Sequence, residues 1–153
     1  MNQLEARVRA NLTAAMKNRD ELRQSTLRMV LAALQKASTS GSAAHELSDD
    51  EALGVLTSEA KRRAEAATAF RDAGRSEQAD REQAEGAVIA EYLPAALSAD
   101  EVAALVADAI AETGAAGPGG MGPVMKLVTP KTRGRADGKE VAAEVRRQLG
   151  AAG

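Results

Sequence analysis

The chain has 153 residues, of which 44% are hydrophobic and 27% are charged, and its formal net charge at pH 7 is −2. Phe70 and Tyr92 are the only aromatic residues, so Ala, Leu, Val and Met must fill the core, which favours closely packed helices over a sheet sandwich. Cysteine is absent. Disulfides and thiolate zinc sites are therefore excluded, and no metal or cofactor motif accompanies the single histidine, His45.

The apolar segments are too short to cross a membrane. A membrane span needs an apolar run of about 18 residues or more, and a signal peptide has a shorter apolar core behind a basic start. The sequence has neither pattern. We therefore expect a cytoplasmic protein that makes no membrane contact.

Helical periodicity predicts two helices in the first 40 residues. The first is marked by apolar residues that recur every four positions: Leu4, Val8, Leu12 and Met16. This helix is expected to end near Asn18, and a second is expected from Asp20 to about Ser40. The broad apolar surface of the second helix predicts that it is buried against more than one neighbour.

Two further helices are expected before Pro94. Ser48 and Glu51 have the spacing of a capping box, so a third helix should begin there and run for about 25 residues to Gly74, which supplies a left-handed terminating residue. Its outer face is expected to carry three consecutive cations, Lys61, Arg62 and Arg63. A fourth helix is expected over about residues 76–92, with small side chains that permit close approach to its neighbours.

Three shorter helices are expected in the remaining sequence. Ser98 and Glu101 form a second capping-box pattern, and Gly114 should end that helix. The next helix starts at Met121 and is expected to end at Pro130. The last opens at Asp137. The prediction is therefore an all-α fold of about seven helices, with a four-helix bundle over residues 1–94 and a three-helix domain over residues 97–150.

The last 33 residues contain a basic loop. Residues 121–153 carry seven basic and three acidic side chains, against the overall charge of −2. The candidate phosphate-binding residues are Lys126, Lys131, Arg133, Arg135, Lys139, Arg146 and Arg147. Three of them alternate along the loop before the last helix, whose N-terminal amides also favour an anion. In the alternative, the cations are simply solvated, or Arg135 and Asp137 fold inward as a pair that fixes the loop.

Three sequence signatures resemble those of the YqeY family: Met121-Gly122-Pro123-Val124-Met125, Gly134-Arg135-Ala136-Asp137-Gly138 and Glu91-Tyr92-Leu93-Pro94. This family resembles the C-terminal tail of the B subunit of glutamine-dependent tRNA amidotransferase. The resemblance implies a larger N-terminal helical bundle followed by a three-helix tail. It also implies contact with tRNA, because the corresponding tail of the amidotransferase holds tRNA.

The residues offer little support for catalysis by the chain alone. The serines lack a nucleophile-elbow or Ser-x-x-Lys pattern, and the glycine-rich segment 117–122 lacks the ending of a P-loop. The first hypothesis is therefore a noncatalytic tRNA-binding accessory module that contacts the RNA backbone.

Two alternatives remain. The chain could be a protein-interaction module that docks a synthetase or an amidotransferase through the acidic fourth helix or the cations at 61–63. The resemblance also leaves open a carbon–nitrogen ligase that uses glutamine as amido-N-donor, acting only within a larger complex.

Overall fold

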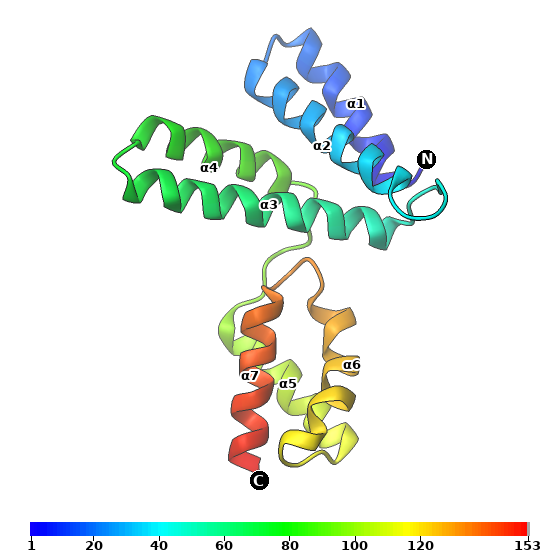
Figure 1. Ribbon diagram of the computed structural model, residues 1–153, viewed down its shortest axis with the longest axis vertical. Coiled ribbons are helices and arrows are strands. Elements are labelled where there is room, and N and C mark those ends of the chain that lie inside the picture. The colour runs from blue at the N-terminus through cyan, green and yellow to red at the C-terminus, as the bar shows by residue number, and fades with distance from the viewer. Residues whose placement is uncertain (153) are drawn as a thin grey trace. The chain divides into compact units, whose positions relative to one another are not determined.

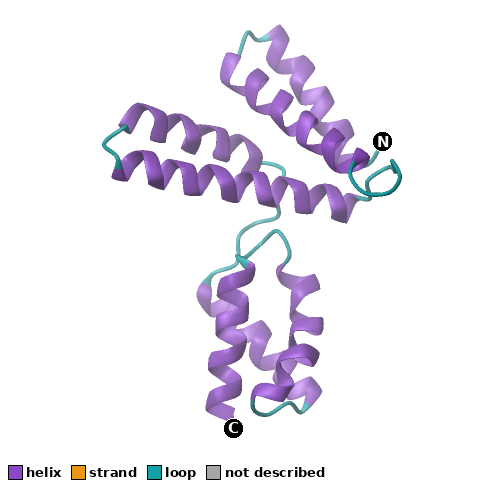
Figure 2. Cartoon of the chain, viewed as in Figure 1, coloured by secondary structure: helices purple, strands orange, loops and turns teal. Residues whose placement is uncertain are grey.

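The computed structural model describes residues 1–152 of the chain, with side chains described up to Gly150. This part contains seven α-helices, one short 3-10 helix and no strand, which confirms the predicted all-α fold (Figures 1 and 2). Its contacts divide the chain into an N-terminal unit, Met1–Leu93, and a C-terminal unit that starts at Pro94. Within the described residues, no helix is both long enough and apolar enough to span a membrane.

The N-terminal unit consists of two helical hairpins. Helix α1 (Gln3–Lys17) pairs with α2 (Glu21–Thr39), and α3 (Asp49–Asp72) pairs with α4 (Ser76–Ala90). The two hairpins cross (Figure 1), so a single four-helix bundle is not confirmed. They share one core, which is drawn from the first halves of α1 and α3 and the later parts of α2 and α4. Its buried residues are Leu4, Val8, Leu27, Val30, Leu34, Leu47, Ala52, Leu56, Val88, Ile89 and Tyr92.

The helix ends of this unit follow the local sequence signals. The Ser48 hydroxyl accepts from the amide of Glu51 at 3.1 Å, and the Glu51 carboxylate accepts from the amide of Ser48 at 2.8 Å, which confirms the predicted capping box. Asp20 likewise caps α2. Asn18 ends α1, and Gly74 follows α3 with a φ of 76°, as predicted. These ends depend on residues within one helical turn, so the sequence alone predicts them.

Arg63 does not lie on the outer face of α3. Only 9% of the residue is exposed, because it follows the fully buried Leu56 by seven residues, or two helical turns, and so shares its inward face. Its guanidinium lies 3.0 Å from Glu59 and 3.5 Å from Glu85 of α4, and donates to the sulfur of Met29 in α2 at 3.4 Å. The prediction of three outward cations is therefore wrong at Arg63.

The C-terminal unit contains α5 (Ala99–Thr113), a 3-10 turn η1 (Pro118–Gly120), α6 (Met121–Thr132) and α7 (Gly138–Ala152). Its core is rich in valine: Val102, Val106, Ala109, Val124, Val128, Val141, Val145 and Leu149. Gly120 is buried beside this core, where an added Cβ would lie 2.6 Å from the Cβ of Ala115.

Helix α6 continues past Pro130, contrary to the prediction that it ends there. Pro130 has no amide to donate to the preceding turn, but the helix runs on to Thr132, and the amide of Arg133 donates to Thr129 at 3.0 Å. The proline removes only one bond of the helix, the one that an amide at this position would donate to the carbonyl of Lys126, so the last turn still forms. The turn to α7 consequently starts two residues later than predicted.

Candidate nucleic-acid interface

The turn between α6 and α7 is tightly hydrogen bonded. The amides of Arg135 and Ala136 donate to the carbonyl of Thr132 at 2.9 and 3.0 Å. Thr132 is itself buried, and its hydroxyl donates to the carbonyl of Val128 at 3.2 Å. Gly134 has a φ of 73°, a conformation that costs glycine little. The backbone of the basic loop is therefore a hydrogen-bonded turn.

Two hydrogen bonds attach this turn to the link that precedes α5. The amide of Leu97 donates to the carbonyl of Arg135 at 2.8 Å, and Nε of Arg135 donates to the carbonyl of Ala95 at 3.0 Å. Arg135 is half-buried and helps to fix the loop through the carbonyl of Ala95. The carbonyl of Ala95 is neutral, however, and that bond uses one of the five N–H donors of the guanidinium. The bond orients the guanidinium without neutralising its charge.

The other cations near the turn are exposed. Lys131 lies in the last turn of α6, Arg133 follows at the end of that helix, and Lys139 lies in the first turn of α7. The carboxylate of Asp137 accepts from the amide of Lys139 at 2.8 Å, which satisfies an amide at the start of α7. The structure thus brings Lys131, Arg133, Arg135 and Lys139 to the same end of the C-terminal unit.

Arg147 is held in an ion pair. Its Nε and Nη2 donate to the two carboxylate oxygens of Glu144 at 2.9 and 2.5 Å. The hydrogen bond from Arg147, followed by one from Gln148, lowers the pKa of Glu144 to about 2, and the pairing raises the pKa of Arg147. Because the pair is neutral overall, Arg147 has little net charge to offer a phosphate.

Lys126 and Arg146 lie away from the turn. Both are exposed, and neither forms an ion pair within the described residues. Arg146 follows the first residue of α7, Gly138, by eight positions, or about 12 Å along the helix axis. Arg146 and Lys139 are seven positions apart, so they share a face of α7. Of the seven predicted residues, the structure therefore gathers four at the turn and places Lys126, Arg146 and Arg147 away from it.

Charge is segregated within the C-terminal unit. From Pro94 onward the sequence has seven basic and seven acidic residues, but α5 carries only acidic ones: Asp100, Glu101, Asp108 and Glu112. All seven cations follow Met121. The unit is therefore neutral in total, while its positive charge is concentrated on α6, α7 and the turn between them, where a polyanion would be attracted.

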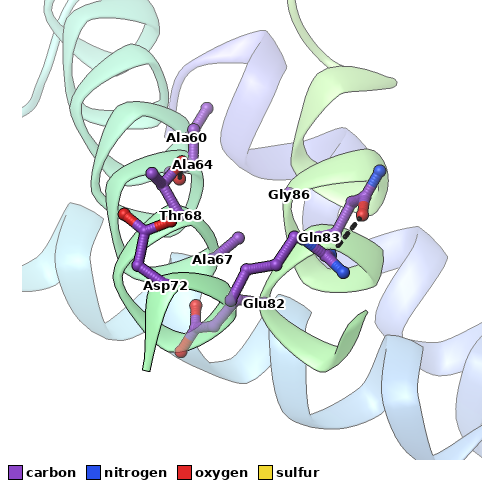
Figure 3. A pocket seen from close by; sticks show the side chains of 9 residues that line it. Ala60, Ala64, Ala67, Thr68, Asp72, Glu82, Gln83 and Gly86 are labelled. Carbon is purple, nitrogen blue, oxygen red and sulfur yellow. Dashed lines mark hydrogen bonds between the residues drawn. The ribbon is translucent and has the colours of Figure 1, made fainter. Parts of the chain in front are cut away.

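The N-terminal unit has a pocket between α3 and α4, lined mostly by small residues (Figure 3). Ala60, Ala64 and Ala67 face Gly86 across it. Arg71 also lines the pocket and donates to Gln83 at 3.2 Å. In the part of the chain that the structure describes, no group of three His, Cys, Asp or Glu side chains could hold a metal ion. This pocket contains no arrangement that resembles an activated nucleophile.

A second groove of this unit lies between α2 and α3, and the sequence reasoning did not single it out. Met29 and Lys36 line it. Met29 and Lys36 are seven residues apart and so lie on one face of α2, away from the buried Leu27 and Leu34. This spacing is the sequence feature that could have indicated the groove. That signal is weak, since only the position of α3 makes the face into a groove.

Comparison with models of protein families matches residues 5–149 to the family described as Yqey-like protein. A search of curated proteins gave no match to the chain. The matched range includes all seven basic residues of α6, the turn and α7.

Proposed function

The chain belongs to the YqeY family. From this membership and from the basic α6–α7 turn, we propose that it is a noncatalytic accessory module that binds folded RNA, tRNA above all. The C-terminal unit contacts the sugar-phosphate backbone with the α6–α7 turn. The proposal rests chiefly on one observation: Arg135 is oriented by the neutral carbonyl of Ala95, which leaves its positive charge available in the same turn that the exposed Lys131 precedes. Guanidinium groups held in this way suit phosphate oxygens.

Recognition is directed to backbone and shape, with little base discrimination. Proteins that read unpaired bases usually stack them on aromatic rings or arginine planes. Tyr92 is 5% exposed and its hydroxyl accepts from Asn11 at 2.6 Å, while Phe70 is half-buried in α3. The C-terminal unit has no aromatic residue. Phosphate contacts therefore supply most of the binding free energy.

Salt dependence tests this mode of binding. With about four phosphate contacts, the affinity for tRNA should fall about 100-fold between 50 and 200 mM salt, because bound counterions are released. Filter binding or gel shift at several salt concentrations measures the slope. A flat response, or an absence of binding at low salt, would contradict the proposal.

Two matched substitutions test whether the turn is the contact surface. Lys131→Gln and Arg147→Gln each remove one positive charge from the same unit. Lys131→Gln should lower the magnitude of the salt slope by about one, whereas Arg147→Gln should change it little because Glu144 already neutralises that arginine. Equal changes in the salt slope for the two variants would show that the α6–α7 turn is not the contact surface for RNA.

An activity assay tests the noncatalytic part of the proposal. The purified protein is incubated with glutamine, and released ammonia is compared with that from a heat-denatured control. Release above the control would assign an enzymatic activity to the chain and overturn this part.

A further inference from the structure

The groove between α2 and α3 has an apolar floor. Met29, Ala33 and Ala37 of α2 and Val55 of α3 line it. Met29 is 37% exposed, and its sulfur accepts a hydrogen bond from the buried Arg63 at 3.4 Å. The thioether is thus held at the surface in a defined position, beside alanines small enough to admit another backbone.

The rim of the groove is positively charged. Lys36 of α2 and Arg62 of α3 are exposed at its edges. Glu59 is the one carboxylate in the lining, and it is shared by Arg62 at 3.5 Å and Arg63 at 3.0 Å. Lys36 has no ion pair within the described residues. Arg63 is buried and already paired with Glu59 and with Glu85 of α4. The exposed charge of the groove therefore comes from Lys36 and Arg62, and it favours an anionic partner.

We propose that this groove docks an amphipathic helix of a partner protein, whose apolar stripe is flanked by carboxylates. The apolar side chains of that helix lie against Met29, Ala33 and Val55. Its carboxylates pair with Lys36 and Arg62, which gives the interaction its charge complementarity. This docking surface is in the N-terminal unit and is independent of the RNA contact proposed for the α6–α7 turn.

The dimensions and chemistry of the groove favour a helix over RNA. Its α2 wall runs from Met29 to Ser40, eleven residues later, so it is about 16 Å long and matches three turns of a docked helix. Exposed methionine adapts to apolar partners. An RNA strand would set its phosphates against methyl groups and a thioether, with cations only at the edges and no aromatic ring on which a base could stack.

Methyl NMR of the full chain labelled at its five methionines tests the proposal. The probe is a helical peptide of about 18 residues with a leucine stripe flanked by glutamates, and the comparison peptide has lysine in place of each glutamate. The glutamate peptide should shift the methyl signal of Met29 and leave Met16, Met121 and Met125 in place. The lysine peptide should bind at least about tenfold more weakly.

A charge-matched pair of variants localises the contact. Lys36→Gln with Arg62→Gln removes two cations from the groove and should weaken the glutamate peptide about tenfold. Lys17→Gln with Arg19→Gln removes two exposed cations at the end of α1 and should leave its affinity unchanged.

Three results would overturn the proposal. In the first, neither peptide shifts the Met29 signal. In the second, both peptides bind alike, or the groove variant and its control behave alike. In the third, tRNA and not the glutamate peptide shifts the Met29 signal, which would make the groove an RNA surface. Since tRNA bound at the α6–α7 turn would instead perturb Met125, which precedes Lys131 by six residues in α6, failure of one proposal is distinguishable from failure of the other.

Discussion

Replacing Arg63 with alanine should destabilise the N-terminal unit by about 3 kcal/mol, because it removes the central cation of a buried ion cluster. The side chains of Arg63, Glu59 and Glu85 are only 10%, 13% and 9% exposed. Removing one partner from a buried pair typically costs about 3–5 kcal/mol. We expect the lower end of that range, since Arg62 still lies 3.5 Å from Glu59, and Arg81 still lies 3.2 Å from Glu85.

Tyrosine fluorescence during urea or thermal unfolding measures this loss. The chain has a single tyrosine and no tryptophan, and Tyr92 is buried in the core of the N-terminal unit. The signal therefore reports on that unit without contribution from the C-terminal one. A loss of about 3 kcal/mol corresponds to a Tm lower by roughly 10–20 °C for a unit of this size.

Arg62→Ala is the matched control. It removes the same side chain from the adjacent position, but the Arg62 side chain is 72% exposed, so the expected loss is at most about 0.5 kcal/mol. Arg63→Lys should fall between the two, because an ammonium group keeps the charge but loses the planar fork that reaches two carboxylates. Equal losses for Arg63→Ala and Arg62→Ala would refute the reasoning that burial, and not charge, sets the cost.

Three other substitutions test local features. The pKa of Glu144 is lowered from 4.5 to about 2 in the folded chain. Its pairing with Arg147 therefore stabilises the fold above about pH 4.5, and this stabilisation is lost as the pH falls towards 2. Arg147→Gln should return the pKa of Glu144 towards 4.5, as measured by a carboxyl-carbon NMR titration. Ser48→Ala should cost about 1 kcal/mol by loss of the α3 cap, measured by tyrosine fluorescence. Gly120→Ala should lower the stability of the C-terminal unit by about 2 kcal/mol, because its methyl group would lie 2.6 Å from the nearest side chain. Gly119→Ala, with nothing within 4 Å of its methyl group, should be nearly neutral. Amide hydrogen exchange measures both.

Each of these predictions has a contradicting outcome. An unchanged pKa of Glu144 would show that Arg147 is not what lowers it. Ser58 is an exposed serine in the interior of the same helix, so Ser58→Ala should be nearly neutral, and a loss equal to that of Ser48→Ala would remove the capping explanation. Equal protection from exchange in the two glycine variants would mean that the loop before α6 can shift to admit a methyl group.

The predicted helix ends depend on short-range interactions, and the sequence predicted most of them. Ser48 and Ser98 accept hydrogen bonds from amides three residues later, and Gly114 ends α5 with a φ of 67°. Such signals act within one helical turn, so reading neighbouring residues is sufficient. Pro130 is the exception, since a proline in the last turn costs too little to end α6. The residues of the basic turn could also be identified from the sequence, because they are contiguous in the chain.

The state of each charged side chain depended on the tertiary structure. Arg63 contacts Glu85, 22 residues away, only because α4 folds back on α3. Arg135 contacts the carbonyl of Ala95, 40 residues away, only because the α6–α7 turn packs against the link before α5. Sequence spacing identified Arg63 as a surface cation and left Arg135 open between a solvated and a folded-inward state. Electrostatic strength depends on distance and burial, and both are set by elements remote in sequence. The sequence therefore determined the helices and which residues are charged, whereas the packing of the helices decided which charges are buried, paired or available to a partner.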